Sequence, residues 1–80
     1  MKFQVKQAGA KSVNGCQWYI VAHPENGGKE LYLHKDYIPR KQAIQTDRSG
    51  HVYYTGWYRT RQEAWNVLNV YKLGKLAETG

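Results

Sequence analysis

Apolar and polar residues alternate along the first part of the chain in short runs that turn residues separate. Phe3 and Val5 have polar neighbours on both sides, and residues 16–23 continue this alternation after an Asn-Gly pair at positions 14–15. One face of the second run carries Cys16, Trp18, Ile20 and Ala22, and the other carries Gln17, Tyr19, Val21 and His23. The pattern predicts two antiparallel strands joined by a tight turn.

The alternation resumes after a Pro- and Gly-containing turn at residues 24–28. Its apolar side carries Leu31 and Leu33, and its other side carries Tyr32 and His34. Pro39 has no backbone N–H for a strand ladder, so we expect it to end this strand. The segment therefore predicts a second hairpin with one apolar and one mixed face.

A third hairpin is predicted from residues 42–58. Residues 42–46 form a weak strand candidate, residues 47–50 read Asp-Arg-Ser-Gly, and residues 51–58 are rich in aromatic residues. Gly56 interrupts the last run, which indicates a bulge or bend that switches the side of the strand facing inward.

A helix is predicted directly after these strands. Thr60 and Glu63 stand in the order of a capping box, in which the hydroxyl accepts from a backbone N–H of the first turn. An apolar stripe at helical spacing follows, made of Ala64, Val67, Leu68 and Tyr71. Gly74 is a natural stop for a helix. We therefore expect a helix at about residues 61–73 and a frayed tail at 76–80.

The fold that accommodates these elements is α+β. A helix with one apolar stripe needs a surface to cover. The sheet would offer Trp18, Ile20, Leu31, Leu33, Ile44 and Val52. The sequence thus predicts one domain over residues 1–80, with a small antiparallel sheet of four or five strands at about 2–58 and one C-terminal helix packed on one face. A chain of 80 residues is too short for a second core.

Composition favours a basic binding protein. Twelve Lys and Arg against six Asp and Glu give a formal charge of +6, which suits an anionic partner. The single cysteine, Cys16, forms no intramolecular disulfide and is expected to be a small buried apolar residue. The sequence has no apolar run of membrane-spanning length, and its first six residues do not resemble a secretory signal. We expect a cytoplasmic protein that does not associate with membranes.

Several chemistries are not indicated. Cys16 and the histidines at 23, 34 and 51 have none of the usual metal-ligand spacings, so the histidines are expected to be partly exposed strand residues. The six carboxylates are scattered, and no nucleophile stands in a recognisable catalytic pattern. We therefore predict a protein that is not an enzyme, with no catalytic residues, metal, cofactor or small-molecule substrate.

The positive charge is concentrated in the middle of the chain. Residues 35–61 contain all four arginines and carry a net charge of +4. Arginine suits phosphate, and aromatic rings between the cations suit stacking on bases. The predicted binding surface for nucleic acid or another partner consists of Arg40, Lys41, Arg48, Tyr53, Trp57, Arg59 and Arg61. Arg59 and Arg61 either form an anion site at the helix start or extend into water.

Residues 43–64 resemble the core of two related DNA-binding families, the three-stranded domain of plant ethylene-response factors and the arm-binding domain of phage integrases. The shared features are a Gly-containing turn, an aromatic strand with Gly56 near its end, and a Thr-x-x-Glu-Ala helix start. The resemblance implies a sheet that enters the major groove of DNA. Arg48, His51 and Tyr53 would then lie on its groove-facing side.

A second hypothesis concerns protein binding. In general type the chain is also similar to small phage-encoded proteins, including inhibitors of host defence systems such as anti-CRISPR proteins. Such an inhibitor would occlude a host protein or ribonucleoprotein complex through an exposed edge strand or a tyrosine-rich face made of Tyr19, Tyr32 and Tyr53. The sequence leaves the oligomeric state open.

Overall fold

The computed structural model of the chain describes residues 2–9, 15–25 and 27–79, with side chains as far as residue 74. Within these ranges the elements are β1 (Lys2–Gln7), β2 (Trp18–His23), β3 (Leu31–Leu33), β4 (Pro39–Arg40), β5 (Gln45–Thr46), β6 (Val52–Tyr53), β7 (Trp57–Tyr58) and α1 (Arg61–Thr79). Asn14 of the predicted Asn-Gly turn lies outside the described residues. Gly15 has a φ of 78°, in the left-handed region that such a turn uses.

The main sheet is antiparallel and is organised around β2. β1 pairs with the whole of β2 along one edge. The other edge is shared, because β3 pairs with residues 21–22 and β7 pairs with residues 18–19. β4 continues the sheet beyond β3, while β5 and β6 form a separate two-stranded sheet. Five strands in one antiparallel sheet, followed by one C-terminal helix, confirm the predicted α+β fold.

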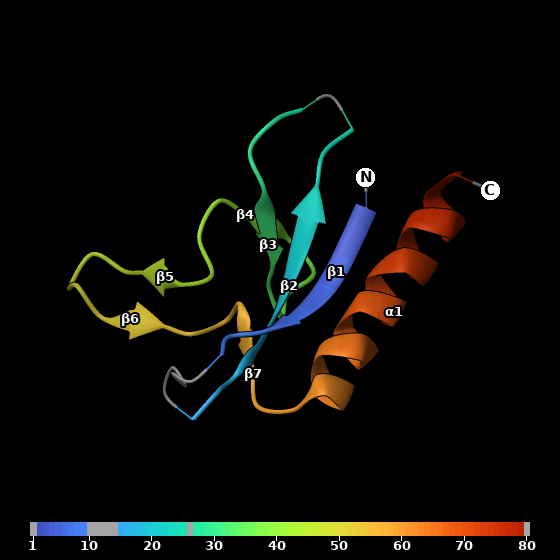
Figure 1. The fold of residues 1–80 in the computed structure, drawn as a ribbon. Coiled ribbons are helices and arrows are strands. Elements are labelled where there is room, and N and C mark those ends of the chain that lie inside the picture. The colour runs from blue at the N-terminus through green and yellow to red at the C-terminus, as the bar shows by residue number, and fades with distance from the viewer. Residues whose placement is uncertain (1, 10–14, 26, 80) are drawn as a thin grey trace.

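α1 covers one face of the main sheet and lies beside β1 (Figure 1). The buried core comprises Ile20, Leu33, Tyr58, Ala64 and Leu68, and the partly buried residues around it are Phe3, Val5, Trp18, Trp65, Val67 and Tyr71. The predicted helical stripe is therefore confirmed as the packing face. Complete burial of a large apolar side chain contributes about 1.5–3 kcal/mol, so this cluster is the main source of stability.

Tyr58 is the largest side chain in this core and is fully buried. Its hydroxyl donates a hydrogen bond to the backbone carbonyl of Leu33 at 2.9 Å, which satisfies the buried polar group. Burial raises the pKa of the phenol because the charged form would lose its hydration. This bond ties β7 to β3, two strands that share the same edge of β2.

Two residues that the sequence assigns to the core lie elsewhere. Ile44 lines a groove formed by residues from the opposite face of the sheet, and Val52 lines a smaller hollow beside β6. Both belong to the segment around the β5–β6 hairpin. This hairpin does not join the main sheet and extends away from α1 (Figure 1), so its apolar residues do not reach the helix.

The helix begins as predicted but ends later. Thr60 Oγ1 accepts a hydrogen bond from the backbone N–H of Glu63 at 3.1 Å, which is the N-cap contact. α1 then continues through Gly74 to Thr79, so the predicted end near residue 73 is wrong. A glycine inside a helix costs about 1 kcal/mol relative to alanine, which lowers helix stability without blocking the conformation.

Pro39 begins a strand, whereas the sequence predicts that it ends one. The backbone N–H of Tyr37 donates to the carbonyl of His34 at 2.9 Å, and the turn closed by this bond reverses the chain. Tyr37 has a φ of 65°, a value that non-glycine residues adopt rarely. β4 then pairs back on β3, with Pro39 opposite Leu33. Here proline is tolerated because β4 is the outermost strand on this side of the sheet.

Candidate functional site

The face of the sheet opposite α1 carries three aromatic rings in contact. The alternation of β2 turns Tyr19 away from the core residue Ile20, and the strand registers place Tyr32 and Trp57 on the same side as Tyr19. The centroids of the Tyr19 and Tyr32 rings are 5.9 Å apart, and those of Tyr19 and Trp57 are 5.3 Å apart at 61°. All three are partly buried, so each retains exposed ring surface. We call these three residues the ring triad.

The ring triad forms part of an open groove of about 880 Å³. The other lining residues come from the end of β1 and from the segment between β4 and β5, and they are Gln7, Ala8, Lys41, Gln42, Ala43 and Ile44. This described lining includes one cation and no carboxylate. Lys6 lies opposite Tyr19 in the register and therefore points to the same side of the sheet. The groove is thus aromatic with basic residues at its margin.

Residues 41–44 form one wall of the groove, and Gly56 holds this wall close to the sheet. The backbone N–H of Gly56 donates to the carbonyl of Ala43 at 2.9 Å. A Cβ on Gly56 would lie 2.5 Å from that carbonyl oxygen, so only glycine fits. The predicted bend at Gly56 therefore has a specific use, which is a close backbone contact that positions Trp57 beside the wall.

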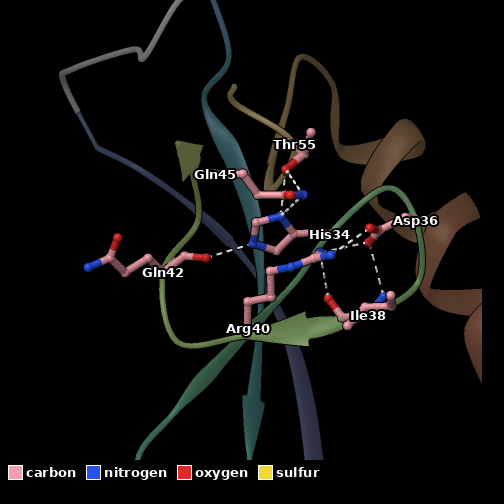
Figure 2. Close-up of polar contacts among 7 residues, drawn as sticks. All are labelled: His34, Asp36, Ile38, Arg40, Gln42, Gln45 and Thr55. Carbon is pink, nitrogen blue, oxygen red and sulfur yellow. Dashed lines mark hydrogen bonds and ion pairs between the residues drawn. The ribbon is translucent and has the colours of Figure 1, made fainter. Parts of the chain in front are cut away.

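His34 supports the same wall from inside the protein. It is fully buried, so the prediction of a partly exposed histidine is wrong here. Its Nε2 donates to the carbonyl of Gln42 at 2.6 Å, and its Nδ1 lies 2.6 Å from Thr55 Oγ1 (Figure 2). A carbonyl only accepts, so Nε2 carries the hydrogen and Nδ1 accepts from the Thr55 hydroxyl. The Gln45 side-chain amide donates in turn to Thr55 Oγ1 at 2.9 Å.

The buried position of His34 favours a neutral imidazole. Burial lowers the pKa of His34, because the charged ring would be poorly hydrated. The positive charge of Arg40 acts in the same direction, while the Gln42 carbonyl and the carboxylate of Asp36 oppose it. The burial follows from position, because the turn after β3 and the segment around Thr55 enclose the ring (Figure 2).

Arg40 belongs to the predicted binding set, and its guanidinium is already engaged. It donates to both carboxylate oxygens of Asp36, with Nη1–Oδ1 at 2.8 Å and Nη2–Oδ2 at 2.7 Å (Figure 2). These bonds hold the pKa of Asp36 below its usual value. Asp36 also accepts from the backbone N–H of Ile38 at 3.2 Å. Arg40 therefore braces the β3–β4 turn, and its fork is not directed at the groove.

Arg48 and Tyr53 belong to the β5–β6 hairpin and its turn, outside the groove lining. The Tyr53 hydroxyl donates to Asp47 at 3.0 Å, and the Tyr53 ring lies 4.5 Å from that of His51. Tyr53 therefore does not join Tyr19 and Tyr32 on one face, as the tyrosine-rich surface would require. The three residues that the family resemblance places on a groove-facing sheet, Arg48, His51 and Tyr53, lie together on this exposed hairpin.

Arg59 and Arg61 flank the helix cap and are exposed. Arg59 lines a smaller hollow of about 340 Å³ together with Lys35 and Tyr53, whereas Arg61 lines neither of these cavities. The Lys35 ammonium lies 3.6 Å from the carboxylate of Glu63 and is partly neutralised by it. Of the seven predicted residues, the structure thus brings Lys41 and Trp57 together in the groove and places Arg59 and Tyr53 beside the smaller hollow.

Comparison with protein-family models, with curated proteins and with solved structures finds no match for this chain. Within the described residues, no group of His, Cys, Asp and Glu is arranged to hold a metal ion. None of the helices in that part of the chain has the length and apolar character needed to cross a membrane.

Sequence patterns indicate the aromatic residues of the groove, but they do not predict that Gln7, Ala8 and residues 42–44 line it. Tyr19 and Tyr32 are predictable from strand alternation, and both were expected on an exposed face. Gln7, Gln42 and the wall around Ala43 had no signal, because they reach the ring triad only through the β1–β2 pairing and the Gly56 contact. The glycine at position 56 was the one local indication that another segment approaches closely there.

Proposed function

We propose that this protein binds nucleic acid, and that the groove around the ring triad is its contact surface. The observation that carries the proposal is the combination of three contiguous rings with Lys41 in a described lining that contains no carboxylate. Exposed aromatic faces beside cations are the usual means by which proteins hold bases and phosphates together.

The aromatic rings and the lysines would contact different parts of a nucleic acid. Stacking a base on an aromatic side chain contributes about 1–3 kcal/mol. The ammonium groups of Lys41 and Lys6 would neutralise phosphates next to the stacked bases, releasing bound counterions. The described part of the lining contains no carboxylate, so it adds no repulsion to the approach of phosphates.

Positive charge outside the groove also favours a nucleic-acid partner. The chain carries a formal net charge of +6. Arg48, Arg59 and Arg61 are exposed and lie on other parts of the surface. Their contribution is a long-range attraction for polyanions, which raises the association rate and weakens as salt screens it.

The test is a binding titration with fluorescently labelled DNA and RNA at about 50 and 200 mM salt. Neutralising two phosphates predicts an affinity about tenfold lower at the higher salt concentration. Lys41→Gln should weaken binding and flatten the salt dependence. Lys29→Gln is the matched control, because Lys29 is an exposed lysine outside the groove lining.

Two results would count against the proposal. Absence of binding to every nucleic acid at low salt would end it. A pull-down from nuclease-treated host lysate that retains a stoichiometric protein partner, combined with weak nucleic-acid binding, would favour the alternative of a protein-directed inhibitor.

A further inference from the structure

We infer that the groove takes single-stranded nucleic acid, with unpaired bases on the ring triad and the backbone passing Lys41 and Lys6. This inference rests on the proposed function and names its substrate class. Three features of the described residues carry it: the position of the rings, the position of the arginines and the amide of Gln42 in the lining.

The faces of the rings suit stacking on unpaired bases. Tyr19, Tyr32 and Trp57 form the sheet side of the groove, and the segment at 41–44 rises beside them as a wall. Inside a duplex, each base already has both faces covered by its neighbours. A ring in a walled groove therefore meets a base face only where the strand is unpaired and its bases are splayed out.

The arginines are not placed to grip a duplex at this site. Double-stranded DNA is held mainly by several cations along its two backbones. In the groove, the described lining supplies one cation, Lys41, and the neighbouring guanidinium of Arg40 is bound to Asp36 in two-point fashion. The other arginines, at 48, 59 and 61, lie outside the lining. The rings, more than the charges, would supply the binding energy here.

The lining also offers a group that reads base edges. Gln42, an exposed residue of the wall, lines the groove. The side-chain amide of Gln7 instead donates to Gln17 Oε1 at 3.4 Å. A glutamine amide donates and accepts hydrogen bonds, which matches the Watson–Crick edge of a base. That edge is available only in a single strand, because pairing occupies it in a duplex. A cavity of about 880 Å³ has the size of a site for a ligand of a few rings.

The experiment compares three probes of equal length with the unaltered protein. They are an oligothymidylate, an oligomer of abasic sites with the same number of phosphates, and a duplex of mixed sequence. We expect the oligothymidylate to bind at least about tenfold more tightly than the abasic oligomer, because one well-stacked base is worth that factor. The duplex should bind no better than the abasic oligomer.

A ring variant adds a second measurement. Trp57→Leu retains an apolar side chain but removes the stacking surface, so it should lose about five- to hundredfold in affinity for the oligothymidylate. Its affinity for the abasic oligomer should stay unchanged, which a general loss of folding would not allow. Tyr37→Leu is the matched control, since Tyr37 is an exposed ring in the turn after β3, outside the lining.

The outcomes separate this inference from the proposed function. Tighter binding of the duplex, or equal binding of the abasic oligomer and the oligothymidylate, would overturn the single-strand inference and leave nucleic-acid binding in place. Failure of all three probes to bind at low salt would overturn both. The comparison of probes decides the matter even where the Trp57 variant does not fold.

Discussion

Acidification should destabilise this protein through His34, because the burial of its ring sets the sign of the effect. Burial lowers the pKa of the folded-state imidazole below its ordinary value of 6.5. Above that value the ring is neutral in both the folded and the unfolded chain. As the pH falls below 6.5, the unfolded chain binds a proton that the folded protein does not, so the free energy of unfolding decreases.

The size of the stability loss is limited by the uptake of a single proton by the unfolded chain. The stability slope is about 1.4 kcal/mol per pH unit over the window between the two pKa values. One such group can therefore lower the free energy of unfolding by at most about 1.4 kcal/mol between pH 7.5 and pH 5.5, the limit in which the folded ring stays neutral throughout. Protonation would also place a hydrogen on Nδ1, which now accepts from Thr55 Oγ1 at 2.6 Å. Loss of this contact should also loosen the wall at residues 41–44, which His34 holds through its hydrogen bond to the Gln42 carbonyl.

The assay is urea unfolding of the wild type and of His34→Phe at pH 7.5 and 5.5. The wild type should lose more stability than the variant, by up to about 1.4 kcal/mol, since all other ionisable groups are common to both proteins. His51→Gln is the control, because it removes an exposed histidine and should keep the wild-type pH dependence. A midpoint for His34 at or above pH 6.5 in an NMR titration of the wild type would refute the reasoning, even where the phenylalanine variant does not fold.

Three further changes test the elements that frame the groove. Gly56→Ala should lower the unfolding free energy by about 1–3 kcal/mol, because its Cβ would meet the Ala43 carbonyl oxygen at 2.5 Å; unchanged thermal stability would show that the wall moves without cost. Thr60→Ala should lower the free energy of unfolding by about 0.5–2 kcal/mol, because it removes the acceptor for the Glu63 N–H. Thr60→Ser is the control, because it keeps a hydroxyl acceptor and should retain the stability measured by chemical unfolding. Asp47→Ala should loosen the β5–β6 turn and speed its amide exchange, since the Asp47 carboxylate accepts four hydrogen bonds. Amide exchange at the turn no faster than in the wild type would contradict this.

The local sequence determined the start and the buried face of α1 and the two faces of β2. The capping residue Thr60 and the stripe that includes Leu68 predict the start and the buried face of α1, and both agree with the structure. The alternation around Ile20 correctly separates the core side of β2 from the side of Tyr19. These features depend on neighbours within one turn of helix or along one strand, where chain geometry alone decides which side chains share a face.

The end of the helix and the fate of Pro39 show where local signals fail. Gly74 disfavours a helix only weakly, so α1 continues past it. Pro39 signals a strand end, yet the turn at His34–Tyr37 reverses the chain and makes it the first residue of β4. For Gly74 the local preference is on the order of 1 kcal/mol. In both cases the conformation of the surrounding chain overrides the local preference.

The candidate site itself was decided by tertiary structure. The charge pattern points to the arginines between residues 40 and 61, but Arg40 is bound to Asp36 and the other three lie outside the groove lining. The groove instead joins β1, β2, β3 and β7 with the wall at 41–44, segments that are distant in sequence. Sequence determines which side chains share a strand face, because that depends on alternation. Which of those faces meet depends on pairings across long loops, and these are settled only when the chain packs as a whole.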